Sequence, residues 1–72
     1  MVNLRILREK KGLTQNKLCE VIKEYGLHMS RTTYSKYETG TNEMPYDVLI
    51  FFSRFFDTTI DYILGITEIE NK

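Results

Sequence analysis

Hydrophobic residues recur at helical spacing along most of the chain, and no segment alternates with the two-residue period of a strand. The clearest stripe lies in a predicted helix over residues 14–25, where apolar side chains stand at i, i+3, i+4 and i+7. Its members are Leu18, Val21, Ile22 and Tyr25. A shorter predicted helix over residues 3–11 carries Leu4 and Leu7 on one face.

The same periodicity predicts three further helices. Over residues 31–39, Tyr34 and Tyr37 define an inward face, and we expect both rings to join the core rather than to stack on bases. A fourth helix takes Pro45 as its first residue and has a broad apolar face. Its inward side chains are Val48, Leu49, Phe52, Phe55 and Phe56. The segment TTIDYILG fits a short fifth helix with a threonine cap and a terminal glycine.

Glycines separate most of these segments. Four of the predicted helices end at a glycine, namely Gly12, Gly26, Gly40 and Gly65. Five short helices with short connections indicate an all-α fold, a compact five-helix bundle. We expect one domain over residues 1–66 and a C-terminal tail over residues 67–72, where the sequence carries no clear structural signal.

Composition narrows the class of protein. The 72 residues are 42% hydrophobic and 28% charged, as expected for one small soluble domain. Cys19 is the only cysteine, so no internal disulfide forms, and a reducing compartment fits best. No apolar run is long enough to span a membrane and no signal peptide is evident, so we expect a cytoplasmic protein. One histidine and one cysteine predict no metal site and no cofactor.

The formal net charge of zero conceals two unlike halves. Residues 1–40 carry eight basic and four acidic residues, whereas residues 41–72 carry two basic and six acidic ones. A basic half and an acidic half suit a molecule that turns one side toward a polyanion. Small domains also show such asymmetry by chance, so the charge alone leaves both interpretations open.

The predicted helix over residues 31–39 combines a capping Ser30 with a polar outer face. Opposite the two tyrosines lie Thr32, Ser35, Lys36 and Thr39, with Arg31 on the flank of the first turn. With the preceding helix, this segment forms a helix-turn-helix outline. In that arrangement the second helix enters the major groove, and short polar side chains let it approach the base edges closely.

Three motifs, KGLTQNKL, RTTYSKYETG and FFDTTIDYILG, occur in this order along the chain. They resemble signatures of the Cro/repressor-type helix-turn-helix regulators, also called the xenobiotic-response-element-like family. The resemblance covers roughly residues 3–66. Each motif alone is weak, but the three in order are specific. The resemblance implies a lambda-repressor-like DNA-binding domain of five helices, usually dimeric on a palindromic operator.

The resemblance also implies roles for individual residues. The base-reading residues would be Arg31, Thr32, Ser35 and Lys36. Contacts with the DNA backbone would come from Gln15, Ser30, Thr39 and Asn42. An ion pair between Arg8 and Glu38 is implied as well, and it would lock the recognition helix to the first helix. Such a partner is needed because Glu38 is predicted to lie at the inward edge of its helix.

Two features depart from the family pattern. The connector KEYGLHMS is about five residues longer than usual, and we expect it to lengthen the second helix by about a turn. It then either tilts the recognition helix or brings Lys23 or His28 near the DNA backbone. The loop TNEM places Glu43 where many relatives have a basic residue. Both features predict modest DNA affinity or a partner-dependent complex.

An apolar patch is expected on the fourth helix at Phe51, which lies off the inward stripe beside Ile50 and Tyr46. Exposed patches of this kind usually mark interfaces. A two-fold dimer through the fourth and fifth helices would place two recognition helices about 34 Å apart, one turn of DNA. The alternative is a helix covered on all sides by a small core.

We therefore expect a regulator of transcription that binds specific double-stranded DNA sequences, most simply a small repressor that forms a homodimer. The alternative is a protein-interaction module, antitoxin-like or dependent on a separate protein partner, with the same fold and weak DNA affinity. An enzyme is not expected, because the sequence shows no paired-carboxylate pocket, no nucleophile motif and no phosphate loop.

Overall fold

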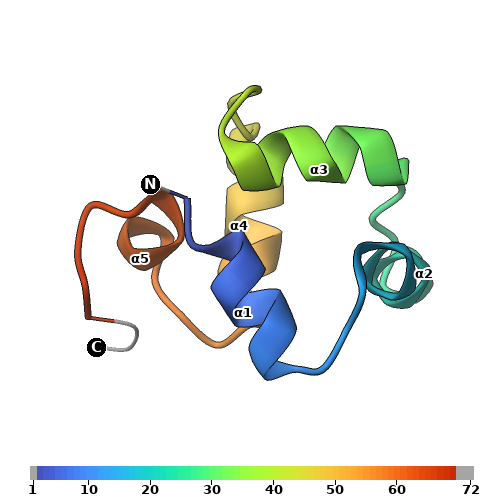
Figure 1. Ribbon diagram of the computed structural model, residues 1–72, viewed down its shortest axis with the longest axis horizontal. Helices are drawn as coiled ribbons and strands as arrows, with labels where there is room; N and C mark the ends of the chain where they lie inside the picture. Colours follow the sequence, from blue (N-terminus) through green and yellow to red (C-terminus); the bar gives the residue numbers. More distant parts are fainter. Residues whose placement is uncertain (1, 70–72) are drawn as a thin grey trace.

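A computed structural model describes residues 2–69 of the chain. Within these residues the chain forms helices and no strand (Figure 1). The helices are α1 (Leu4–Lys10), α2 (Gln15–Glu24), α3 (Arg31–Thr39), α4 (Tyr46–Phe55) and α5 (Ile60–Leu64). The predicted all-α fold with five helices is confirmed. The last three residues of the predicted tail, 70–72, lie outside the described residues.

Short polar side chains cap the start of three helices, and at α5 Thr59 Oγ1 accepts a hydrogen bond from the N–H of Tyr62 at 3.1 Å. Thr14 Oγ1 accepts a hydrogen bond from the backbone N–H of Lys17 at 3.1 Å, and Ser30 Oγ accepts one from the N–H of Thr33 at 3.1 Å. Each bond pairs an amide that has no acceptor within its own helix, and such a cap contributes about 1 kcal/mol to stability. The predicted starts of α2 and α3 are therefore correct, and so is the predicted threonine cap of α5.

Two other predicted helix starts need correction. Pro45 is the residue before α4 rather than its first helical residue. Asn3 precedes α1, but its side chain does not cap the helix. Instead, Asn3 Nδ2 donates to the carbonyl oxygen of Tyr62 at 2.7 Å, and its N–H donates to that of Ile63 at 2.8 Å. These bonds fasten the start of the chain to α5.

One hydrophobic core joins all five helices. The fully buried side chains are Tyr34, Phe52, Leu4, Leu18, Ile22 and Ile63. Full burial of a side chain of this size contributes roughly 1.5–3 kcal/mol, so these six carry much of the fold. The core position of Tyr34 agrees with the prediction, and Tyr37 is half-buried against the same cluster. None of the helices described is long and apolar enough to cross a membrane.

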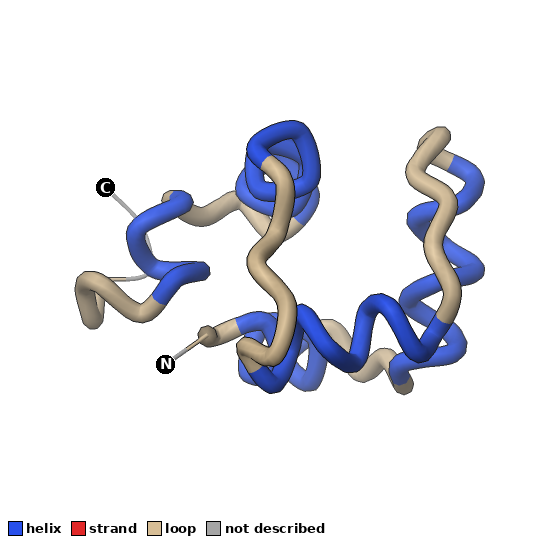
Figure 2. The backbone as a smooth tube through the Cα atoms, turned by 90° about the horizontal axis from the view of Figure 1, so that it is seen from above, coloured by secondary structure: helices blue, strands red, loops and turns tan. Residues whose placement is uncertain are grey.

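The lengthened connector turns back beside α2. Gly26 has a φ of 96°, which places the chain in the left-handed region that favours glycine. The N–H of Gly26 then donates to the carbonyl oxygen of Lys23, and that of Leu27 to Ile22, both at 3.0 Å. Figure 2 shows the connector, in tan, running back along α2, so that α3 begins near the start of α2.

The prediction that Tyr25 belongs to the buried stripe of the second helix is wrong, because its side chain is 68% exposed. It is the residue that follows the last helical residue of α2, so a helical projection no longer gives its direction. Its ring lies edge-on to Phe55 at 5.7 Å and to Phe51 at 6.4 Å between ring centroids. The end of α2 thus brings a tyrosine against α4.

Candidate nucleic-acid interface

The outer face of α3 carries hydroxyl and basic groups. Arg31, Thr32 and Lys36 are exposed, whereas Ser35 is half-buried. Glu38 is the one acidic residue in α3, and its carboxylate is turned inward, where only 6% of the side chain is exposed. The exposed face of α3 therefore presents cations and hydroxyls without a carboxylate among them.

The carboxylate of Glu38 is held by Arg8 of α1. Arg8 Nε donates to Glu38 Oε2 at 2.8 Å, and Arg8 Nη2 donates to Oε1 at 3.3 Å. The remaining Nη1 donates to the carbonyl oxygen of Leu13 at 2.8 Å. The two charged side chains are 11% and 6% exposed, so the pair lies at the edge of the core. The predicted ion pair is present, and it fastens α3 to α1.

Gln15, the first residue of α2, extends this contact toward the outer face. Its Nε2 donates to Glu38 Oε1 at 2.9 Å, and its Oε1 accepts from Arg31 Nη1 at 3.2 Å. A continuous polar chain thus runs from Arg8 through Glu38 and Gln15 to Arg31. A phosphate contact by Gln15 was expected from the sequence, whereas its hydrogen bond with Arg31 was not.

Several hydrogen bonds converge on the Glu38 carboxylate and set its protonation. Burial alone would raise the pKa of Glu38, but hydrogen bonds from Arg8 and Gln15, together with the Arg8 charge, lower it below the ordinary value of 4.5. Glu38 is therefore ionised at neutral pH. Burial raises the pKa of the neighbouring Tyr34, whose hydroxyl lies beside the pair but forms no hydrogen bond with any described residue. Tyr34 is thus a neutral phenol.

The start of α3 offers backbone amides to an anion. The hydroxyl of Ser30 is already occupied, since it accepts from the N–H of Thr33 and donates to Thr33 Oγ1 at 3.0 Å. The N–H groups of Arg31 and Thr32 have no acceptor within the helix, and such a helix start attracts phosphate. A phosphate bound at this end would therefore accept hydrogen bonds from these two amides rather than from the Ser30 hydroxyl.

The loop after α3 folds back on the end of that helix. The N–H of Asn42 donates to the carbonyl oxygen of Lys36 at 3.2 Å. Thr39 Oγ1 donates to the same carbonyl at 3.2 Å and lies 2.9 Å from Thr41 Oγ1. Asn42 and Glu43 are both exposed. Four of the residues predicted to touch the DNA backbone thus lie at the ends of α3, with Gln15 and Ser30 at its start and Thr39 and Asn42 at its end.

Comparison with known proteins identifies the family. A helix-turn-helix family model matches residues 4–63, which is most of the chain. The chain belongs to the Cro/C1-type helix-turn-helix family. The predicted family is therefore confirmed, and the family is one of DNA-binding regulators of transcription. No solved structure matches the chain significantly.

The chain is similar to three named regulators. YobD and YqaE of Bacillus subtilis (strain 168) are both described as uncharacterized HTH-type transcriptional regulators. YobD is 35% identical over 65 residues, which are 90% of this chain and 54% of YobD, and YqaE is 36% identical over 62 residues, 86% and 49%. The HTH-type transcriptional activator BcrR of Enterococcus faecalis is 39% identical over 75 aligned positions, 96% and 34%. The chain therefore spans about half the length of these relatives, or less.

Lys23 lies apart from the other predicted contact residues of this helix-turn-helix domain. It is eight residues beyond Gln15, about 12 Å along the axis of α2. Because Arg31 at the start of α3 bonds to Gln15, the start of α3 lies at the opposite end of α2 from Lys23. The contact between Lys23 and the DNA backbone stays a prediction, for a residue set apart from Gln15 and Arg31.

Metal binding and reaction through the Cys19 thiol find little support in the described part of the chain. No group of three or more His, Cys, Asp or Glu side chains within residues 2–69 could hold a metal ion. Burial raises the pKa of the Cys19 thiol, and the nearby charge of Arg31 opposes this only in part. A thiol with a raised pKa is a poor nucleophile at neutral pH.

The predicted patch on α4 is less exposed than the sequence indicated. Tyr46 is 73% exposed, whereas Ile50 and Phe51 are half-buried. The Phe51 ring stacks on Phe55 at 5.7 Å between centroids and is partly covered by Tyr25. A helical projection of α4 alone could not predict that Phe51 is covered, because the covering ring of Tyr25 comes from the end of α2.

Proposed function

We propose that this helix-turn-helix domain recognises a specific sequence in double-stranded DNA by placing α3 in the major groove. The observation that carries the proposal is the inward position of Glu38. Its pairing with Arg8 and Gln15 leaves the outer face of α3 free of negative charge, which a helix lying between phosphates requires.

Base reading is assigned to Arg31, Thr32, Ser35 and Lys36. Arg31 and Lys36 have the reach and the donors to bond guanine O6 and N7, and the shorter hydroxyl side chains fit close to the base edges. A good bidentate contact contributes about 1–3 kcal/mol of discrimination against the wrong base. Because Gln15 holds Arg31, we propose that the guanidinium is already oriented before DNA arrives.

Backbone contacts are assigned to the two ends of α3. The amides that follow Ser30 would hold one phosphate, and Thr39 with Asn42 would hold another. Gln15 Nε2 donates one of its two protons to Glu38 and would donate the other to a phosphate. These contacts fix the register of the helix on the duplex but carry no sequence information.

Repression is the proposed direction of regulation, and a homodimer is the proposed assembly. A bound domain blocks a promoter without further contacts, whereas activation needs an additional surface. BcrR is named an activator, so a reporter gene behind the selected site is the direct test of direction. Tyr46, Ile50 and Phe51 remain the proposed dimer residues, and the domain is proposed to end at residue 66.

A protein-interaction module with weak DNA affinity is the second proposed function. Two features favour it. Glu43 is exposed in the loop after α3, and an apolar hollow beside α4 is lined by Tyr25, Ile50, Phe51 and Phe55 together with Asp47 and Arg54. The two functions differ in their response to salt. Binding to DNA loses about 0.9 log units of affinity per log unit of salt for each neutralised phosphate, and a contact between proteins need not.

The test of sequence recognition is selection of binding sites from a pool of random duplexes. The wild-type protein is expected to enrich one motif, and Arg31→Ala is expected to lose the preference at one or two positions while still binding DNA. Lys23→Ala is the matched control and should enrich the wild-type motif. If Arg31→Ala enriches an unchanged motif, Arg31 does not read a base.

A further inference from the structure

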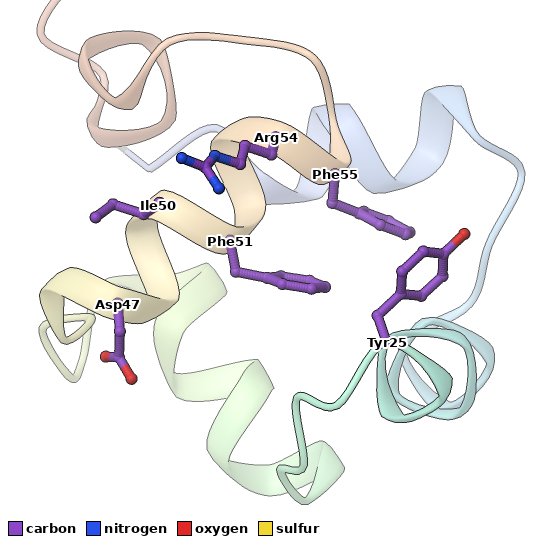
Figure 3. A pocket seen from close by; sticks show the side chains of 6 residues that line it. All are labelled: Tyr25, Asp47, Ile50, Phe51, Arg54 and Phe55. Carbon is purple, nitrogen blue, oxygen red and sulfur yellow. The ribbon is translucent and has the colours of Figure 1, made fainter.

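The hollow beside α4 has the size and the lining of a small-molecule site. Its volume is about 420 Å³. Figure 3 shows the side chains that line it, which are Tyr25, Asp47, Ile50, Phe51, Arg54 and Phe55. Sites for small molecules are concave, measure about 300–1,000 Å³ and combine aromatic walls with a few polar groups. The hollow meets each of these conditions, and no residue assigned to DNA contact lines it.

Three aromatic rings form one end of the hollow. Phe51 and Phe55 stand one turn apart on α4, and their rings are nearly parallel, with an angle of 14° between the planes. The ring of Tyr25 stands edge-on to both, at 5.7 Å from Phe55 and 6.4 Å from Phe51 between centroids. In Figure 3 both phenylalanine rings point toward Tyr25. Aromatic groups prefer stacked and edge-on contacts at such distances, so this end suits another flat ring.

Two cations flank these rings. Arg54 directly precedes Phe55 and is exposed, and its guanidinium forms no hydrogen bond or ion pair with any of residues 2–69. Lys11 of the segment after α1 lies on the other side, with its Nζ 5.3 Å from the centroid of the Phe55 ring. A guanidinium binds a carboxylate or phosphate through two parallel N–H groups. The charge beside the rings therefore favours a molecule with an anionic group.

Asp47 does not reverse this preference. Its carboxylate stands seven residues before Arg54, about 10 Å away along the axis of α4. Its Oδ1 already accepts a hydrogen bond from the N–H of Val48 at 3.0 Å. An acidic residue in the first turn is also stabilised by the helix dipole. Of the two charged groups in the lining, Arg54 is therefore the one available to a ligand.

We propose that this hollow binds a small aromatic molecule that carries an anionic group such as a carboxylate. The aromatic body would pack against Tyr25, Phe51 and Phe55. In Figure 3 the Arg54 side chain extends toward Ile50 and away from the rings, so the anionic group would lie at the opposite end of the ligand from the ring that Tyr25 contacts. The proposal goes beyond the reading of DNA and does not rest on it.

A ligand in the hollow would compete with the proposed dimer. Ile50 and Phe51 line the hollow and are also two of the proposed dimer residues. A ligand that covers their side chains leaves them unable to contact a second copy. The hollow would thus be a place where a small molecule changes the assembly of the domain without touching α3.

The test is a fluorescence titration without DNA, using two probes that differ in one group. Anilinonaphthalene sulfonate is an aromatic anion whose sulfonate stands in for the carboxylate, and N-phenylnaphthylamine has the same rings without the sulfonate. The wild type is expected to bind both probes, and to bind the sulfonate about ten-fold more tightly, because a hydrogen bond to a charged group adds to the ring contacts.

Two variants separate the charge from the rings. Arg54→Gln should weaken binding of the sulfonate about ten-fold and leave binding of the amine unchanged. Tyr25→Ala removes a ring that is 68% exposed, so the fold should persist while both probes bind more weakly. Arg31→Ala/Lys36→Ala, which removes two cations from the outer face of α3, is the matched control and should bind both probes as the wild type does.

Far-UV circular dichroism verifies that each variant is helical, because the sulfonate probe also binds loosened cores. A helical wild type that does not bind the sulfonate, or that binds both probes equally, would overturn the proposal. So would an equal loss of sulfonate binding in Arg54→Gln and in the control. Displacement of saturating sulfonate when the protein is concentrated would assign the hollow to a second copy instead. Since no DNA is present, each outcome leaves the reading of DNA by α3 to its own test.

Discussion

Glu38 links the stability of the domain to the chemistry of its outer face. Helical projection predicted its inward position, and the resemblance to the family supplied Arg8 as its partner. The part played by Gln15 was not predictable in the same way. It depends on how close the start of α2 lies to the start of α3, which is a distance between two elements and not a property of either.

Removing the Glu38 charge should destabilise the fold. Glu38→Gln leaves the guanidinium of Arg8 near the core without a counter-charge, and we expect the free energy of unfolding to fall by about 3 kcal/mol. This is the lower end of the range for a broken buried pair, because both groups lie near the surface. The loss is large for a domain of 72 residues, whose total stability is roughly 4–11 kcal/mol. Urea unfolding followed by circular dichroism measures it.

Glu9→Gln is the matched control for this variant. It breaks the pair between Arg5 and Glu9, whose side chains are 71% and 54% exposed. An exposed pair of this kind contributes at most about 1 kcal/mol. Equal losses of stability in Glu38→Gln and Glu9→Gln would contradict a structural role for the inner pair.

The effect of Glu38 should also depend on pH. Its folded-state pKa lies below the ordinary value of 4.5, so the ionised carboxylate stabilises the fold above that pH. The contribution is lost as the pH falls through the lowered pKa of the folded state. The difference in unfolding free energy between the wild type and Glu38→Gln is thus expected to be constant near neutral pH and to shrink in acid. Urea midpoints along a pH series test this, and a difference that grows in acid would refute it.

The ends of the helices were largely predictable from the sequence, because caps and glycines act locally. Thr14 and Ser30 begin α2 and α3, and Gly26 and Gly40 follow their ends. The path of the connector was not predictable, since both a tilted recognition helix and a basic contact near DNA fitted its length. The structure shows a return along α2 that brings the start of α3 back to Gln15 (Figure 2).

Gly26 forms the turn at which the connector reverses direction, so replacing it should lower the free energy of unfolding. An added Cβ would meet no atom within 4 Å, so the penalty of Gly26→Ala comes from the φ of 96° alone. We expect a loss of about 1–2 kcal/mol in urea unfolding. Gly26→Asn should lose less, because asparagine tolerates left-handed backbone better than alanine. Wild-type stability in Gly26→Ala would show that the connector does not need this turn.

The whole molecule carries two surfaces of different chemistry. The outer face of α3 presents cations and hydroxyls, and the hollow beside α4 presents aromatic rings between one acidic and one basic residue. The net charge of zero is therefore an average over unlike regions, and it does not argue against binding to a polyanion. The second surface was only partly visible in the sequence, where Phe51 stood out and Tyr25 did not.

The central claim, that α3 reads DNA, is tested most directly by fluorescence anisotropy. Labelled mixed-sequence duplex is titrated with the wild type, with Arg31→Ala/Lys36→Ala and with Lys10→Ala/Lys23→Ala, a double variant that loses the same charge from the ends of α1 and α2. We expect wild-type binding that weakens steeply between low and moderate salt, and loss of most of that binding only when Arg31 and Lys36 are replaced. Absence of binding at both salt concentrations, or an equal loss in both double variants, would contradict the assignment of α3 as the recognition helix.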